Sequence, residues 1–298
     1  MDQIIVQPNL VYEILSFLDS NAFHAFCFTS VRVGKLTLTH ELTRKLCQPH
    51  KIKFKTDSFL KRKKMTHDPL TEASMFGDVG IVNELILRGY KQGVRNTSAL
   101  TFAARHGKSQ VVDRLLQETW VNPSYNRNEA ICLACEYGHL PVLNSLLNHR
   151  IWVNPAAGTN TPIRRACQNG HLGVVERLLQ CERVDPGQPG CYAFWWACVN
   201  NHPKVVELLL RDGRVDPTER GDELILQICA RGYYEVLVLI LEDGQLNPAI
   251  NKNGAIKTAQ KNGHAPLVAR LLQDERVLKS LSPDLLQEMC VFLESIKG

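Results

Sequence analysis

The sequence predicts an all-α protein in which short helix pairs stack into a solenoid, with a small helical module at the N-terminus. Three patterns in the 298-residue chain support this prediction. A turn dipeptide, a glycine and a set of apolar pairs each recur about every 31 residues. Such a period is typical of repeat proteins, in which each unit buries its apolar faces against its neighbours.

The turn signals recur in step. The dipeptide is Asn-Pro or Asp-Pro, at Asn122-Pro123, Asn154-Pro155, Asp185-Pro186, Asp216-Pro217 and Asn247-Pro248. The glycine series is Gly77, Gly107, Gly138, Gly170, Gly232 and Gly263, with Asn201 in its place once. Gly and Asn both accept the left-handed conformation that ends many helices. We therefore expect the first helix of each unit to end there, and the dipeptide to break the second helix.

Apolar residues keep a fixed distance from each glycine. Two apolar pairs follow it, as in Val111-Val112 and Leu115-Leu116, and this spacing places all four side chains on one helical face. A small residue precedes it by four positions and would let a neighbouring helix approach closely. The series is Ala73, Ala103, Ala134, Ala166, Ala197, Ile228 as the exception, and Ala259.

These markers divide the chain into four parts. A helical module is expected at 1–50, a basic linker at 51–66, a repeat stack at 67–278 and a C-terminal capping helix at 279–298. Seven units are expected in the stack, at 67–96, 97–124, 125–156, 157–187, 188–218, 219–249 and 250–278. A cap is expected because terminal repeats need a polar outer face.

The units resemble ankyrin repeats. The segment Asn160 to Leu172, NTPIRRACQNGHL, resembles the family's Thr-Pro-Leu-His-x-Ala-x-x-x-Gly-His-Leu core, and Asn128 to Leu147 and Asn253 to Leu272 resemble it nearly as well. The units are shorter than the usual 33 residues, which indicates shortened hairpin turns. The resemblance implies an ankyrin-repeat solenoid that acts as a non-catalytic scaffold and binds a protein partner on its concave face. It implies partner contacts at Arg105, His106, Glu136, Tyr137, Gln168, Asn169, Val199, Asn200, Ala230, Arg231, Lys261 and Asn262.

The N-terminal segment carries a different pattern. Val6 to Leu18, VQPNLVYEILSFL, resembles the opening of an F-box, a module that docks onto the adaptor of cullin-type ubiquitin ligases. The resemblance implies a substrate receptor whose adaptor-binding residues are Leu10, Val11, Ile14, Leu15 and Leu18. Val6 and Gln7 stand where Leu-Pro is expected, and the tryptophan of the usual ending is missing. The alternative is a helical cap on the first repeat, in a structural or effector protein with no ligase link.

Candidate chemical sites are few. Cys132 and Cys135 form a CxxC, but Cys135, Cys167, Cys198 and Cys229 share one repeat position, which favours buried apolar thiols over a metal or redox site. His139, His171, His202 and His264 share another position. Units lie roughly 8–10 Å apart, too far to share an ion, so we expect hydrogen bonds at the helix junction. No phosphate-binding loop or nucleophile motif occurs, so no enzyme activity, cofactor, metal or small-molecule substrate is expected.

Charge and hydropathy limit the remaining classes of function and the expected location. Residues 51–64 hold seven Lys or Arg and one Asp, which accounts for the whole net charge of +5, so nucleic-acid binding by the repeats is not expected. The sequence has neither an apolar run of membrane length nor a secretion signal, and an intracellular location, cytoplasmic or nuclear, is expected. The run Lys61 to Lys64 is either a nuclear import signal, a contact for an acidic partner, or a solvated surface.

Trp195 and Trp196 either anchor an interface or fill the core between units.

Overall fold

The computed structural model describes most of the chain after residue 54. The described residues are 55–61, 67–91, 98–149, 153–188 and 190–297, and these contain helices and turns but no strand. The F-box-like segment, and with it Leu10, Val11, Ile14, Leu15 and Leu18, lies outside the described residues. Of the basic run, only Lys61 is described, and its side chain is exposed.

Fourteen of the described helices form seven pairs. The first helices of the pairs are α4 (Pro69–Phe76), α6 (Ser98–Arg105), α8 (Tyr125–Glu136), α10 (Ala157–Gln168), α12 (Tyr192–Val199), α14 (Gly221–Arg231) and α16 (Ile250–Lys261). The second helices are α5 (Val79–Leu87), α7 (Ser109–Leu115), α9 (Leu140–Asn148), α11 (Leu172–Leu179), α13 (Pro203–Asp212), α15 (Tyr234–Asp243) and α17 (Ala265–Leu271).

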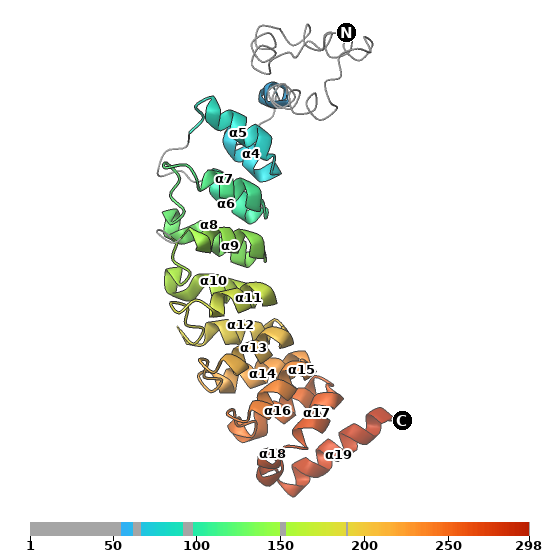
Figure 1. Ribbon diagram of the computed structural model, residues 1–298. Coiled ribbons are helices and arrows are strands. Elements are labelled where there is room, and N and C mark those ends of the chain that lie inside the picture. Colours follow the sequence, from blue (N-terminus) through green and yellow to red (C-terminus); the bar gives the residue numbers. More distant parts are fainter. Residues whose placement is uncertain (1–54, 62–66, 92–97, 150–152, 189, 298) are drawn as a thin grey trace, which may run out of the picture.

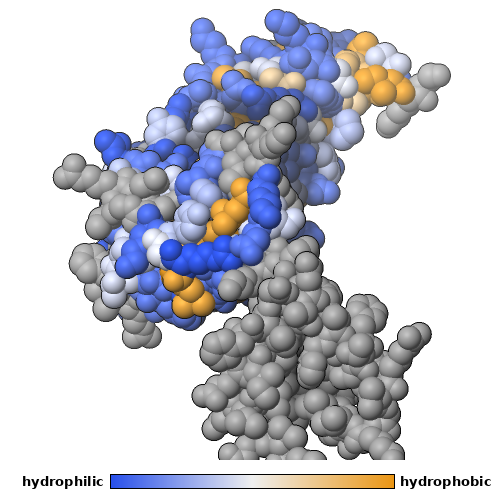
Figure 2. Space-filling view, turned by 90° about the horizontal axis from the view of Figure 1, so that it is seen from above, coloured by the Kyte–Doolittle hydropathy of each residue, from blue (hydrophilic) through white to orange (hydrophobic). Residues whose placement is uncertain are grey.

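The pairs stack in chain order into an elongated solenoid (Figure 1). First helices contact the first helices of neighbouring pairs, and second helices contact second helices. The molecule therefore has two helical layers, which we call the inner layer (first helices) and the outer layer (second helices). This confirms the predicted all-α fold. Hydrophilic residues cover most of the described surface that is visible from one end, with small separate hydrophobic patches (Figure 2).

The core lies between the two layers and runs the length of the stack. The small residues four positions before the turn are all fully buried, and so is Ile228, where the series departs from alanine. The apolar pairs of the second helices also face inward: Val111, Val112 and Leu115 have no exposed surface. Because each unit buries these side chains against the next, neighbouring interfaces supply the stability of the stack.

The Asn/Asp-Pro dipeptides have a different role from the one predicted. Helix α13 ends at Asp212, before Asp216-Pro217, and α9 ends at Asn148, before Asn154-Pro155. The side chain of Asp216 accepts a hydrogen bond from the backbone N–H of Thr218 at 2.8 Å. This is an Asx turn, in which a side chain organises the backbone two residues further on. The expectation that the dipeptide breaks the second helix was therefore wrong, because the dipeptide shapes the entry to the next unit.

A left-handed segment lies in the first turn of the inner helices α8, α10 and α16. Asn126 to Asn128 have φ values of 49°, 57° and 62°, and the segments 158–160 and 251–253 repeat this conformation. Left-handed backbone costs about 1–2 kcal/mol per ordinary residue, and Gly or Asn tolerate it best. The third residue is a buried Asn that reaches the loop leading into the next unit: Asn128 Oδ1 accepts from the N–H of Asn154 at 2.8 Å. These compact turns stand at the start of three of the described units.

Two further helices follow the last pair, α18 (Glu275–Ser280) and α19 (Pro283–Lys297). Arg276 donates to the carbonyls of Gly244 and Leu246, as Arg214 donates to carbonyls of the unit before it. The seventh unit therefore keeps the contacts of the repeat to its end, at Arg276, before the chain departs from the repeat. Helix α19 then packs on α17 through the fully buried Met289, in the place where a capping helix is expected.

Candidate binding face on the inner layer

The histidine series joins four of the units to the unit before each of them. His171 Nε2 donates to the carbonyl of Glu136 at 2.9 Å, and His139, His202 and His264 make the same bond to the residues at positions 105, 168 and 230. The accepting residue always stands two positions before the turn. The predicted hydrogen-bonding role at the helix junction is confirmed. Among the described residues, no three His, Cys, Asp or Glu side chains are grouped as a metal site would require.

These bonds fix the backbone at the end of each inner helix, where the predicted partner contacts lie. Most of those side chains are exposed: Arg105, His106, Tyr137, Gln168, Asn169, Arg231, Lys261 and Asn262. Glu136, Asn200 and Ala230 are partly exposed. The prediction that Val199 contacts a partner through its side chain was wrong, because that side chain is only 2% exposed and belongs to the core. An apolar side chain at this position turns inward, so Val199 offers its backbone rather than its side chain.

Two of the predicted contact residues are held by bonds inside the stack. Arg231 donates to the carbonyl of Val199, in the unit where no histidine is available for that bond. Asn200 donates to the carbonyl of Gln168 at 2.8 Å. Arg105 lies over the ring of Tyr137, 5.4 Å from its centroid. Several side chains of the inner face are therefore already positioned by their neighbours.

A second row of partly exposed side chains lies on the inner layer, five positions before the turn. It comprises Phe102, Leu133, Arg165, Trp196 and Gln227. Residues four apart on a helix share a face, so this row could have been found by stepping back one turn from the predicted contacts. Phe102, for example, stacks on His106 with ring centroids 6.4 Å apart. The units therefore present on the inner face both the residues just before the turn and the residue one helical turn earlier.

One region of the inner face concentrates aromatic rings and guanidinium groups. We call it the aromatic–arginine stripe: Arg164, Tyr192, Trp195, Trp196 and Arg220. Arg164 and Arg220 lie 5.7 and 5.0 Å from the centroid of the Tyr192 ring, and Arg220 also lies 5.1 Å from the Trp195 ring. Trp195 and Trp196 meet edge to face at 4.8 Å. Both tryptophans pack on the core and remain partly exposed, so neither alternative drawn from the sequence describes them alone.

The two layers differ in charge. The inner helices carry eight Arg or Lys and five Asp or Glu, whereas the outer helices carry five and eight. Burial, followed by the charge of Arg105, lowers the pKa of His106 below its ordinary value, so this imidazole is neutral at about pH 7. The positive character of the inner face therefore comes from Arg and Lys.

The cysteine series is chemically quiet. Burial raises the pKa of Cys135, Cys167 and Cys198 far above the ordinary thiol value, and raises that of Cys132 as well. The thiolate is the nucleophile and the metal ligand, so a protonated buried thiol performs neither function. These side chains act as small apolar groups of the core.

Comparison with known proteins agrees with this geometry. The family model described as Ankyrin repeats (3 copies) matches residues 70–157 and 163–253. The chain belongs to the ankyrin-repeat family. The match ends at residue 253, whereas α16 and α17 continue the same pairing beyond it. No significant match occurs among curated proteins.

Three solved ankyrin repeat domains resemble the chain. The domain of human ASB11 has a TM-score of 0.54 at 21% identity, covering 73% of this chain and 99% of that one. The domain of Bcl-3, a member of the IkappaB protein family, has a TM-score of 0.51 at 20% identity, covering 62% and 90%. A domain from Acinetobacter baumannii has a TM-score of 0.48 at 22% identity, covering 59% and 97%. At these identities the likeness to the ASB11 and Bcl-3 domains establishes the fold alone.

Membership of the family agrees with a protein-interaction scaffold, because ankyrin repeats generally bind protein partners and are generally not catalytic. No described helix is both long enough and apolar enough to cross a bilayer.

Proposed function

We propose that this ankyrin-repeat protein is a non-catalytic scaffold that binds one protein partner on the inner face. The observation that carries the proposal is the row of exposed side chains before each turn, several of them positioned by neighbours, such as Arg105, Tyr137 and Arg231. Interfaces owe much of their affinity to side chains that need little reordering on binding. The mixture of charge, amide and aromatic groups suits a protein surface better than a small apolar ligand.

Affinity capture with the full chain tests this proposal. The double variant Arg105→Glu/Lys261→Glu changes two exposed inner-face cations. The matched control Lys204→Glu/Arg211→Glu makes the same charge change on α13 of the outer layer, where both side chains are also exposed. We expect the inner-face variant to lose a specific partner that the control keeps. Equal retention or equal loss of partners by the two variants would contradict the proposal.

We further propose that the protein is a substrate receptor of a cullin-type ubiquitin ligase. This rests on the resemblance of Val6 to Leu18 to an F-box, in which the spacing of Leu10, Ile14 and Leu15 predicts one apolar helical face. Co-purification with the cullin adaptor is expected, and Leu15→Asp is expected to abolish it. If Leu15→Asp leaves a detected interaction unchanged, the docking proposal fails.

The competing proposal is a structural or effector protein with no ligase link, whose N-terminus caps the first repeat. It predicts that residues 1–50 pack on α4 and α5 and unfold together with them. Hydrogen exchange of the full chain separates the two. Exchange from residues 1–50 that is independent of the repeats favours the receptor, and a shared transition favours the cap.

The location of the protein stays a prediction. An intracellular site, cytoplasmic or nuclear, is expected from the sequence, and the run Lys61 to Lys64 is the candidate import signal. Microscopy of a fluorescent fusion in which Lys61, Arg62, Lys63 and Lys64 are all changed to Ala tests this signal. Unchanged nuclear content in that variant would rule it out.

A further inference from the structure

We propose that the inner face recognises an acidic segment of its protein partner and seats an aromatic side chain of that segment against Trp196. This inference rests on the proposed function, because it names the chemistry of the partner for the same face. Three observations support it: unneutralised cations on the inner layer, the rigid aromatic–arginine stripe, and two hydrogen-bond donors within it that lack acceptors.

Several inner-face cations have no carboxylate partner. Arg105, Arg164, Arg231, Lys257 and Lys261 form no ion pair with any residue that the structure describes. Arg105 and Arg164 lie over tyrosine rings and Arg231 binds a carbonyl, so each keeps its full charge. A row of like charges on one face attracts a partner of the opposite charge and repels a basic one.

The acidic groups nearby limit where such a partner can bind. Glu136 pairs with Arg165, and Glu223 pairs with Arg220 at 2.8 Å. These carboxylates neutralise two of the cations on the inner side of the stack. Of the two guanidinium groups in the stripe, that of Arg164 therefore remains available to bind a carboxylate of the partner. An acidic segment is therefore expected to cross the stack near α10 and α12 and to continue toward Lys257 and Lys261.

The stripe has the properties of an anchoring site. Arg220, at the entry to α14, lies between the rings of Tyr192 and Trp195, which fixes all three side chains. Trp195 in turn holds Trp196 through its edge-to-face contact. Trp, Tyr and Arg are the residues that most often dominate binding energy at protein interfaces, especially when they are preorganised. The partly exposed ring of Trp196 offers a surface on which another aromatic ring can pack.

Two donors in the stripe lack acceptors. Arg164 Nε and Trp195 Nε1 are both buried, and neither has a hydrogen-bond partner in the described part of the chain. The two residues occupy the same repeat position in neighbouring units. Arg and Trp side chains donate hydrogen bonds and accept none. These two atoms are covered by neighbouring side chains, whereas Arg164 as a residue is partly exposed, and a carboxylate is the acceptor that complements a guanidinium group best.

Fluorescence anisotropy with the full chain tests the proposal. The first probe is a labelled peptide of about 12 residues, rich in Glu and Asp, with one central Phe. The second replaces the acids by Lys, the third replaces the Phe by Ala, and the fourth is a single-stranded DNA of similar length. We expect the acidic peptide with Phe to bind about tenfold or more tightly than each of the others, and salt to weaken it.

Variants locate the binding. Arg164→Gln and Trp196→Ala are each expected to weaken the acidic peptide about tenfold, whereas the outer-face control Lys204→Gln leaves it unchanged. Arg220→Lys keeps the charge but loses the planar stacking, and is expected to weaken binding as well. Circular dichroism confirms that each variant is folded. The Phe→Ala peptide tests the aromatic contact independently if Trp196→Ala does not fold.

Three results would overturn the proposal. These are equal binding of acidic and basic peptides, tightest binding of the DNA, and full binding by Arg164→Gln. If the capture experiment loses its partner in Arg105→Glu/Lys261→Glu while the acidic peptide shows no preference, the proposed function stands and this inference falls. If capture is unaffected by those substitutions, the proposed function itself falls.

Discussion

Arg231 donates a hydrogen bond to the carbonyl of Val199 at the junction where Asn201 replaces the turn glycine and Tyr233 stands in the histidine position. At four other junctions a histidine lies over a turn glycine: a Cβ on Gly138 would lie 2.5 Å from His171 Nδ1. Asn201 has a Cβ, so a histidine could not occupy the same place at position 233. Arg231 supplies the missing donor and binds the carbonyl of Val199. The stack therefore keeps this inter-unit bond by changing three residues together.

Gly138→Ala is expected to destabilise the protein more than Gly263→Ala does. Both glycines are left-handed, with φ of 75° and 76°, but nothing lies within 4 Å of a Cβ at Gly263. The second variant therefore costs the backbone strain alone, about 1–2 kcal/mol. The first also displaces His171 from the carbonyl of Glu136, adding about 1 kcal/mol or more. Urea unfolding measures both, and equal losses would show that the histidine contact contributes nothing.

Arg231→Met is expected to lower the free energy of unfolding by about 1 kcal/mol, because the carbonyl of Val199 loses its donor. The pair Asn201→Gly and Tyr233→His would restore the arrangement of the other junctions. In the Arg231→Met background, this pair is expected to recover most of the loss. A double-mutant cycle measures the coupling. Additive effects would mean that the three residues do not act on one bond.

Asn160→Ala is expected to cost about 1–3 kcal/mol more than Asn251→Ala. Both residues are left-handed asparagines, so the backbone strain is similar. Asn160 is buried and accepts from the N–H of Asp185 at 3.1 Å, whereas Asn251 is exposed. Hydrogen exchange at the Asp185 amide should accelerate only in the first variant. Unchanged protection of that amide in Asn160→Ala would refute the link between units.

Stability is expected to fall at alkaline pH under reducing conditions. Burial raises the pKa of Cys229 from an ordinary value near 9 to about 12. The unfolded chain therefore loses thiol protons at a lower pH than the folded chain does. Because the folded state holds more protons in this range, stability declines as the pH rises above about 9 toward 12. Cys229→Ala should make the unfolding midpoint less dependent on alkaline pH. An unaltered dependence would indicate that other groups are responsible.

The repeat register made the fold predictable. Ala103, Ala134 and the histidines could be assigned because each stands at a fixed distance from the turn, and neighbours of one kind must then meet across units. The left-handed turn at Asn126 to Asn128 could not be assigned, since Asn and Arg give no local signal for three such residues. Its stability depends on a bond to Asn154, 26 residues further along the chain, which is a tertiary contact.

The inner face was only partly predictable for the same reason. Arg105 and Lys261 are placed by register alone. The role of Arg220 depends on the entry loop of one unit folding over Tyr192 and Trp195 of the unit before it. The prediction for Val199 was wrong because repeat register fixes the position of a residue but not the direction of its side chain. An apolar side chain at this position packs into the core.

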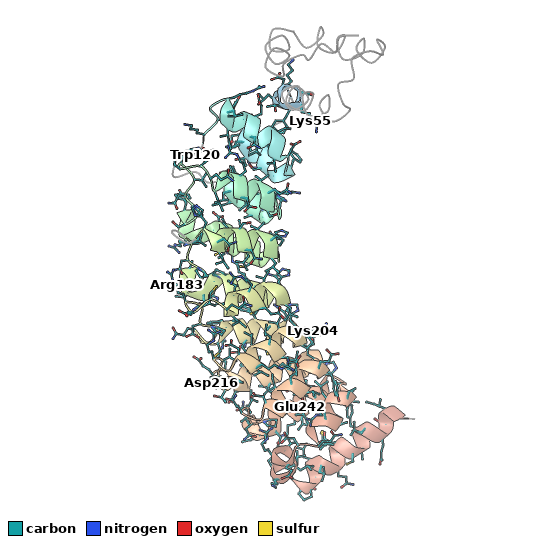
Figure 3. All side chains as sticks on the ribbon, in the orientation of Figure 1. Lys55, Trp120, Arg183, Lys204, Asp216 and Glu242 are labelled. Carbon is teal, nitrogen blue, oxygen red and sulfur yellow. The ribbon has the colours of Figure 1, made fainter. Side chains whose placement is uncertain are left out.

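Hydrogen exchange with mass spectrometry, on the full chain with and without its captured partner, is the most direct test of the binding face. The account predicts slower exchange in the bound state at the ends of the inner helices, over 99–106, 130–137, 161–169 and 192–200. It predicts no change along the edge of inter-unit loops that carries Trp120, Arg183 and Asp216 (Figure 3). Protection confined to that edge or to the outer helices would contradict it.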